Sequence, residues 1–140
     1  MEATGPGGSV DAALMIAETI HQRGWRTMIR VGQVCVSACT YIWLSGRHSI
    51  MQRGASLCFH QAFDSETLKP VPEINPILAD RLVDYGLTKQ QAWALLNAAP
   101  PEDARCMNLI WGLSLGFRPQ VVFTIGGLSA CQAKFCQAIP

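Results

Sequence analysis

Ser37 and His60 are the residues of this 140-residue sequence whose types and spacing best suit chemistry. Ser37 follows a predicted strand and the Gly32-Gln33 break, and it opens an apolar run, so we expect it at the N-terminal end of a helix. Free N–H groups and the helix dipole favour developing negative charge there. His60 ends the next predicted strand, and parallel neighbouring strands would bring the two chain ends together. A serine nucleophile beside a histidine base is the arrangement used in acyl transfer.

The glycine pair Gly7-Gly8 could supply the donors that such a reaction needs for its oxyanion. Glycine can present its amide at close approach because it has no Cβ. Each feature also has a simpler explanation. A serine at a helix start is most often an N-cap, a histidine at a strand end is usually a structural donor, and two glycines usually form a turn. The order of the three features along the chain favours the catalytic interpretation.

The cysteines raise a metal site as an alternative. Cys35, Cys39, Cys58 and His60 all have ligand chemistry for zinc, with a C-x3-C pair followed by a C-x-H pair. Cys58 and His60 share one face of the predicted strand, which favours this interpretation. Cys35 ends a strand while Cys39 lies one turn into a helix, an awkward pair for a tetrahedral site. The sequence therefore argues against a zinc site, although it leaves this alternative open.

A disulfide between Cys35 and Cys39 is a further alternative. It requires their Cα atoms to lie within about 7 Å of each other, and it would persist only in an oxidising compartment. Such a bond would brace the turn that presents Ser37. Without it, Cys39 is a small buried hydrophobe. Cys131 and Cys136 could pair in the same way, and the sequence leaves both pairings open.

Alternating helices and strands must position these residues. Helical spacing and end signals predict helices over 9–24, 37–44, 75–86 and 88–100, and a short one over 108–115. Alternating polarity predicts strands over 26–31, 55–63 and 120–125. Asn75 is the predicted N-cap of the third helix, and Thr88 with Gln91 has the spacing of a capping box. The pattern predicts one α/β domain with crossover connections.

Composition excludes several classes of protein. With 49% hydrophobic residues, 15% charged residues and a net charge of +1, the chain is globular and offers no surface for nucleic acid. It contains no apolar run of the roughly 18 residues that a membrane-spanning helix needs. It also begins without a signal peptide, which predicts a cytoplasmic protein with reduced thiols. A lost N-terminus would instead allow a periplasmic or exported one.

Two stretches, "GPGGSVDAALMIAETI" and "VCVSACTYIWLSGRHSIMQRGASLCFHQAF", carry a family resemblance. Together they resemble the proteolytic subunit of the Clp protease and its exported, Clp-like relatives. The CxSAC motif around Ser37 resembles these exported relatives more than the housekeeping protease. The resemblance covers residues 5–118. It implies a ClpP/crotonase-type fold of repeated strand-turn-helix units with a helical arm, over one domain of residues 1–140. The tail, 126–140, lies beyond the resemblance, and the fold's N-terminal strands are expected to be missing.

The resemblance also implies roles for particular residues. Ser37 would be the nucleophile and His60 the base. The amides of Gly8 and Ala38 would form the oxyanion hole. Asp103 is the candidate triad acid.

The acid is the least regular part of this resemblance. Strict alignment places Ala104 where the family has its acid, one residue after Asp103. Two alternatives stay open: Glu102 is the triad acid, or the chain has no triad acid. Loss of a triad acid leaves partial activity, because the Ser–His pair and the oxyanion hole remain.

The expected function is that of a serine hydrolase, specifically a peptidase, acting on a peptide or protein substrate without a cofactor. The resemblance implies a homo-oligomer and allows an unfoldase partner. Two alternatives stay open: a catalytically inactive Clp-like assembly or binding subunit, and a Cys/His zinc-binding protein. The sequence specifies neither the substrate nor the size of the oligomer.

Overall fold

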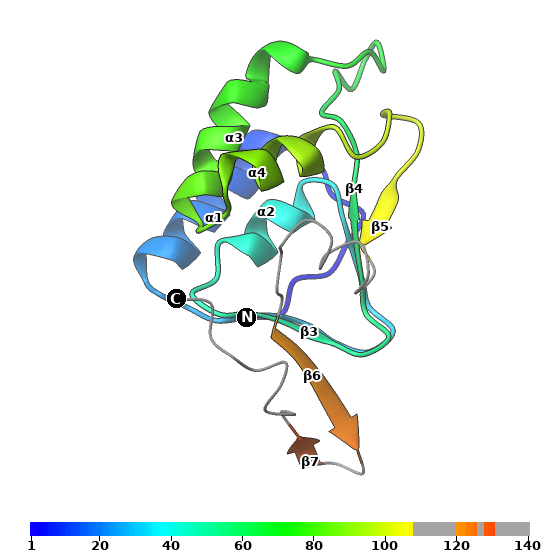
Figure 1. The fold of residues 1–140 in the computed structure, drawn as a ribbon. Helices are drawn as coiled ribbons and strands as arrows, with labels where there is room; N and C mark the ends of the chain where they lie inside the picture. Colours follow the sequence, from blue (N-terminus) through cyan, green and yellow to red (C-terminus); the bar gives the residue numbers. More distant parts are fainter. Residues whose placement is uncertain (108–119, 126–127, 131–140) are drawn as a thin grey trace.

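The computed structural model has an α/β fold in which two small sheets meet at a bend and the helices lie in the angle between them (Figure 1). It describes residues 1–107, 120–125 and 128–130, with side chains described over 1–107. The strands are β1 (Thr27–Ile29), β2 (Val34–Val36), β3 (Ser49–Gln52), β4 (Ser56–Phe59), β5 (Arg105–Met107), β6 (Gln120–Ile125) and β7 (Leu128–Ala130). The helices are α1 (Val10–Gln22), α2 (Cys39–Leu44), α3 (Asn75–Asp84) and α4 (Lys89–Leu96), with a 3-10 turn, η1 (Pro72–Ile74).

Two parallel segments of the chain, 27–36 and 49–59, each contribute one strand to both sheets. β1 pairs with β3 in one sheet, and β2 pairs with β4 in the other, so the same two segments stay side by side across the bend. β6 extends the first sheet parallel to β3, and β5 extends the second antiparallel to β4. Parallel strands end at the same edge of a sheet. Ser37 and His60, which directly follow β2 and β4, are therefore delivered to one edge.

Residues 1–5 form an extended segment beside β1 and β2. The N–H of Gly5 donates to the carbonyl of Val34 (2.9 Å), and the N–H of Val36 donates back to the carbonyl of Gly5 (3.0 Å). This segment leads straight into Gly7-Gly8. The pairing brings the two glycines to the same edge as Ser37.

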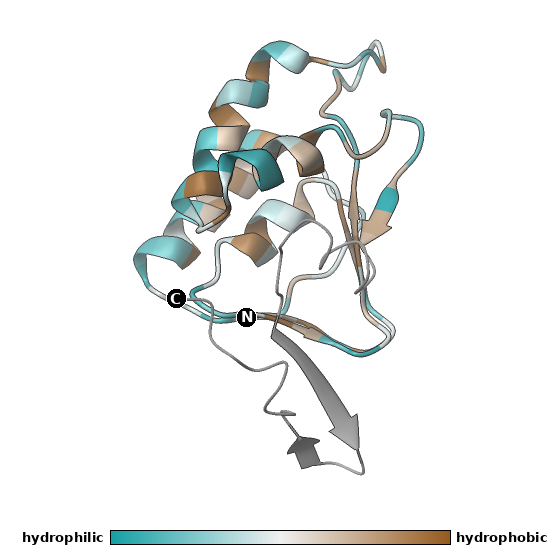
Figure 2. Cartoon of the chain, viewed as in Figure 1, coloured by the Kyte–Doolittle hydropathy of each residue, from teal (hydrophilic) through white to brown (hydrophobic). Residues whose placement is uncertain are grey.

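The core fills the angle between the sheets and the helices. Trp43 of α2 and Leu57 of β4 are fully buried, and the indole N–H of Trp43 donates to the carbonyl of Ile50 (2.9 Å). Figure 2 shows apolar stretches along β3 and β4 and apolar and polar residues alternating along the helices. Fully burying one large aliphatic or aromatic side chain contributes about 1.5–3 kcal/mol. This packing fixes the strand ends that carry the candidate site.

The helix ends largely follow the sequence prediction. Ser9 caps α1 by accepting the N–H of Ala12, and Thr88 with Gln91 forms the predicted capping box of α4. The prediction that Asn75 caps α3 is wrong. Because η1 runs directly into α3, Asn75 is already helical, and its side chain is buried.

Other differences concern short elements and residues outside the described ranges. The sequence patterns placed the end of a strand at Cys35 but gave β2 no bounds, and they missed β3 and β5. The strand predicted over 120–125 is confirmed as β6. The helix predicted over 108–115, as well as Cys131 and Cys136, lies outside the described residues. In the part of the chain that is described, no helix is long and apolar enough to cross a membrane.

Candidate active site

Ser37 lies in a tight turn between β2 and α2. Its φ of 55° is in the left-handed region, which residues other than glycine rarely adopt. Helix α2 begins at Cys39 with Ala38 as its N-cap, so Ser37 precedes the helix instead of opening it as predicted. Backbone strain of this kind persists only where neighbouring contacts impose it.

Three hydrogen bonds hold the Ser37 turn. The N–H of Ser37 donates to the carbonyl of Cys58 on the adjacent strand (2.9 Å). The carbonyl of Ser37 accepts the N–H of Thr40 (2.8 Å) and also its hydroxyl (2.6 Å). Both backbone groups of Ser37 are therefore satisfied by other residues, and its hydroxyl does not cap α2, whose N-cap is Ala38 without a side-chain bond.

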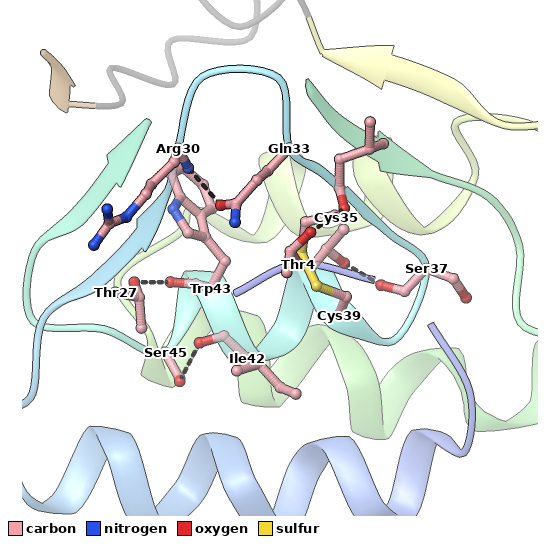
Figure 3. Close-up of a disulfide and its surroundings, with 12 residues drawn as sticks. Thr4, Thr27, Arg30, Gln33, Cys35, Ser37, Cys39, Ile42, Trp43 and Ser45 are labelled. Atoms are coloured by element: carbon pink, nitrogen blue, oxygen red, sulfur yellow. Dashed lines mark hydrogen bonds between the residues drawn. A yellow bond between two sulfur atoms is a disulfide. The ribbon is translucent and has the colours of Figure 1, made fainter. Parts of the chain in front are cut away.

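A disulfide between Cys35 and Cys39 spans the same turn (Figure 3). The two Cα atoms lie 5.4 Å apart, within the range that a disulfide allows, so of the alternatives left open for these cysteines the structure has the disulfide. It links β2 directly to the first residue of α2 and brackets Ser37. Both cysteines are buried, Cys35 completely and Cys39 with 7% of its surface exposed.

His60 directly follows β4 and is held by the next residue along the chain. Its Nδ1 lies 2.7 Å from the carbonyl oxygen of Gln61, which can only accept a hydrogen bond. In the neutral ring the proton therefore lies on Nδ1, and Nε2 carries the free electron pair of a base. The peptide between His60 and Gln61 is held in turn, because the Gln61 N–H donates to the carbonyl of Ala99 (2.9 Å). The ring of Phe63 also contacts the imidazole, with centroids 5.5 Å apart.

Ser37 and His60 line the same narrow pocket. Its volume is about 20 Å³, room for one water-sized group. The other lining residues are Val10, Thr40, Tyr41, Phe59, Leu82, Leu95 and Leu96. Burial raises the pKa of the Tyr41 phenol, so this wall stays uncharged at neutral pH. Within residues 1–107, no hydrogen bond joins the Ser37 hydroxyl to the imidazole of His60.

The two residues whose amides are predicted to bind the oxyanion, Gly8 and Ala38, do not line the pocket of Ser37 and His60. Gly8 and Ala38 both line a second hollow, of about 350 Å³, between residues 1–9 and helices α1 and α2. Within residues 1–107, neither of these N–H groups donates a hydrogen bond to another group of the chain. Free amides at the starts of two helices can bind an anion.

Asp103 lies apart from the pocket. It is exposed in the loop between α4 and β5, and its carboxylate accepts the N–H of Ala104 (2.7 Å). The structure gives it no hydrogen bond to His60 within residues 1–107, and neighbouring Glu102 is also exposed. The acceptor on the Nδ1 side of His60 is instead the Gln61 carbonyl. Sequence reasoning missed this group because a backbone carbonyl has no signature in the sequence.

Sequence reasoning also missed a second disulfide, between Cys58 and Cys106. These residues are direct partners in the antiparallel pairing of β4 and β5. The pairing could have been found from the sequence only if residues 105–107 had been predicted as a strand beside β4.

The zinc alternative is wrong for the residues described. Cys35, Cys39 and Cys58 are all bonded in disulfides, so none offers the thiolate that a zinc ion requires. Across the described ranges, no group of three or more His, Cys, Asp or Glu side chains could hold a metal ion.

Comparison with solved structures identifies proteases of similar fold. A serine-to-alanine variant of the membrane-bound stomatin-specific protease 1510-N matches with a TM-score of 0.62 and 19% identity, covering 86% of this chain and 61% of that one. A lysine-to-alanine variant of the same protease, in complex with a substrate peptide, gives 0.61 and 19%, covering 96% and 61%. A variant of ClpP1 from Listeria monocytogenes gives 0.52 and 14%, covering 90% and 74%.

These matches establish the fold. The predicted ClpP-like α/β architecture is confirmed, and the chain spans 61% of the length of the stomatin-specific protease. No protein-family model matches the sequence, and no curated protein matches it either. The likeness is thus one of three-dimensional structure, at 14–19% sequence identity.

Proposed function

We propose that this chain, which has the fold of the Clp-like proteases, is a serine peptidase acting on a peptide or protein substrate. The observation that carries the proposal is the placement of Ser37 and His60 in one pocket, with Ser37 in a left-handed turn. A nucleophile on a strained strand-to-helix turn presents its side chain away from the backbone. The proteases of similar fold support peptide-bond cleavage over other acyl transfers.

In the proposed reaction, Nε2 of His60 accepts the hydroxyl proton of Ser37 as Oγ attacks the substrate carbonyl carbon. The resulting oxyanion is bound by the N–H groups of Gly8 and Ala38. His60 then returns the proton to the leaving amine, which departs and leaves an ester on Ser37. Water, deprotonated by His60, hydrolyses this ester and regenerates the serine. In other hydrolases, one oxyanion donor contributes about 10²–10³-fold to the rate.

The imidazole also needs an acceptor on its Nδ1 side. The Gln61 carbonyl lies in that position and would hold the ring in the tautomer that the reaction needs. Asp103 stays a prediction as the triad acid: its carboxylate would have to leave the Ala104 amide to reach His60. A homo-oligomer and an unfoldase partner likewise remain proposals that rest on the family resemblance.

Covalent labelling with a fluorophosphonate probe tests the proposal. We expect one adduct, located on the Ser37 peptide by mass spectrometry, which Ser37→Ala abolishes and His60→Gln strongly slows. Ser65→Ala, at an exposed serine of the loop after β4, is the matched control and should label like the unchanged protein.

A different result would favour the second candidate, an inactive assembly or binding subunit. The observation that favours this alternative is that, within residues 1–107, no hydrogen bond joins the Ser37 hydroxyl to His60. If the protein is folded by circular dichroism and thermal unfolding but shows no adduct that depends on Ser37, it is not a serine hydrolase.

A further inference from the structure

We propose that the Cys58–Cys106 disulfide positions His60 and makes the active site sensitive to thiol reductants. The inference rests on the proposed function, and it concerns a bond that the sequence did not predict. Cys58 lies two residues before His60 on β4, and Cys106 is its partner at the centre of β5. The bond therefore ties the histidine's strand to the neighbouring one.

Strand β5 depends strongly on this bond. It has three residues, and its described sheet partner is β4. Two of those residues, Arg105 and Cys106, are exposed, so Met107, with 4% of its surface exposed, is the one side chain of β5 buried in the core. A strand this short is only weakly stabilised by its own hydrogen bonds. The covalent link adds to the packing of that one side chain.

A short series of contacts connects β5 to the imidazole. The loop that precedes β5 carries Ala99, whose carbonyl accepts the N–H of Gln61 (2.9 Å). The carbonyl of the same Gln61 faces Nδ1 of His60 at 2.7 Å. When β5 separates from β4, this loop is held only at its α4 end, and the backbone on either side of the Gln61 Cα can rotate. His60 then loses the acceptor that fixes its tautomer and ring orientation.

The two disulfides differ in their access to solvent. Cys35 and Cys39 are 0% and 7% exposed, and Cys58 is 2% exposed, whereas Cys106 is an exposed residue. Thiol exchange needs access for the attacking sulfur, and exposed disulfides are the more labile ones. The Cys58–Cys106 bond should therefore open first while the Cys35–Cys39 bond stays closed.

The reaction needs an external dithiol such as dithiothreitol. Its thiolate attacks Sγ of Cys106, forming a mixed disulfide and releasing Cys58 as a thiolate that takes up a proton. The second thiol of the reagent then attacks the mixed disulfide and releases Cys106. The products are two cysteine thiols and one cyclic oxidised dithiol, so two electrons have passed to the protein.

A redox titration of the unchanged protein tests the proposal without a variant. Peptidase activity is measured across ratios of reduced to oxidised dithiothreitol, and free thiols are trapped with N-ethylmaleimide and located by mass spectrometry. We expect kcat to fall about 10- to 100-fold, as for a misplaced catalytic group, with KM changed less than about twofold. The fall should follow the opening of Cys58–Cys106, and reoxidation should restore activity.

Two paired variants separate the bonds. The double variant Cys58→Ser with Cys106→Ser should be as slow as the reduced protein and insensitive to dithiothreitol. Cys35→Ala with Cys39→Ala should stay sensitive. Full activity after Cys58–Cys106 has opened in the unchanged protein would refute the proposal, whatever the variants do.

The ring nitrogens of His60 give a readout that does not require activity. The chain has three histidines, so His21→Gln and His48→Gln assign the ¹⁵N signals. We expect the Nδ1–H tautomer in the oxidised protein and a mixture of tautomers once Cys58–Cys106 is reduced. If this change occurs in a protein that never hydrolyses peptides, the proposed function fails and the positioning role stands. An unchanged tautomer after reduction would overturn the positioning role.

Discussion

The backbone of Gly7 packs directly against the Ser37 turn. A Cβ at position 7 would lie 2.7 Å from the Cβ of Ser37 and 2.9 Å from the carbonyl oxygen of Val36. Gly7 also has a φ of 100°, which side chains disfavour. Glycine is thus required here by both space and conformation. Gly8 follows directly, so this contact also fixes the first proposed oxyanion donor relative to the nucleophile.

Gly7→Ala should therefore lower both stability and activity. We expect a loss of about 1–3 kcal/mol in the free energy of unfolding from strain, and a further loss from the clash. At an equal fraction of folded protein, kcat/KM should fall at least about 100-fold, because a displacement near 1 Å at a reacting group can cost that much. Thermal unfolding and steady-state kinetics measure the two effects.

Gly86→Ala is the matched control for Gly7→Ala. Gly86 has a φ of 98°, but a Cβ there would meet no atom within 4 Å. This variant carries the conformational cost alone and should keep its activity. If both variants lost activity equally when compared at the same fraction folded, the close approach of Gly7 to Ser37 would not matter for the site.

Thr40 should support the Ser37 turn through its hydroxyl. Thr40→Val removes the 2.6 Å hydrogen bond to the Ser37 carbonyl while keeping the shape of the side chain. We expect a loss of about 1–2 kcal/mol in unfolding free energy and a roughly tenfold lower kcat. Thr40→Ser keeps the hydroxyl and should retain most of the activity. Equal kcat for the Val and Ser variants would show that this bond does not position the nucleophile.

Asp103→Asn decides between two acceptors for His60. Because the carboxylate of Asp103 is exposed and bonded to the Ala104 amide, and the Gln61 carbonyl already faces Nδ1, we expect kcat to change less than about threefold. In a serine protease, replacing a triad aspartate by asparagine lowers kcat by about 10⁴-fold. A loss of that size, with unfolding unchanged, would establish Asp103 as the acid.

The placement of Ser37 and His60 beside one pocket could be predicted, because each residue's position at the end of a strand can be recognised from the neighbouring sequence. Each residue directly follows a strand, and parallel pairing of β2 with β4 brings the two strand ends together. The Cys35–Cys39 bond was foreseen as an alternative for the same reason, since only four positions separate the two residues. Short-range geometry sets such distances within narrow limits.

The Cys58–Cys106 bond could not be predicted, because it depends on long-range pairing. The two cysteines are 48 positions apart, and β5 has only three residues, too few for a polarity pattern. The role of the Gln61 carbonyl was missed for a related reason. Any residue has a carbonyl, and only the 2.7 Å distance from the Gln61 oxygen to Nδ1 of His60 shows which way this one points.

Asp64 closes the turn that begins shortly after His60. One of its carboxylate oxygens accepts the N–H groups of Glu66 (3.0 Å) and Thr67 (2.7 Å) and the hydroxyl of Thr67 (2.9 Å). These bonds, chiefly those from Thr67, hold the pKa of Asp64 below its ordinary value of 3.8. Because the pKa is lower in the folded state, the turn's stabilisation is fully present above that value. It is lost as the pH falls through the pKa of the folded protein.

Thr67→Val should raise the pKa of Asp64 toward 3.8, because it removes the side-chain donor and leaves the backbone donor. Thr67→Ser keeps a hydroxyl and should leave the pKa where it is. Titration of the Asp64 carboxyl ¹³C signal by NMR measures both. Proteolysis of the loop at pH below 3.8 should begin at a higher pH in the Val variant than in the Ser variant, since the Val variant's turn loses its charge earlier. Identical titration curves for the two variants would show that the Thr67 hydroxyl does not stabilise the carboxylate.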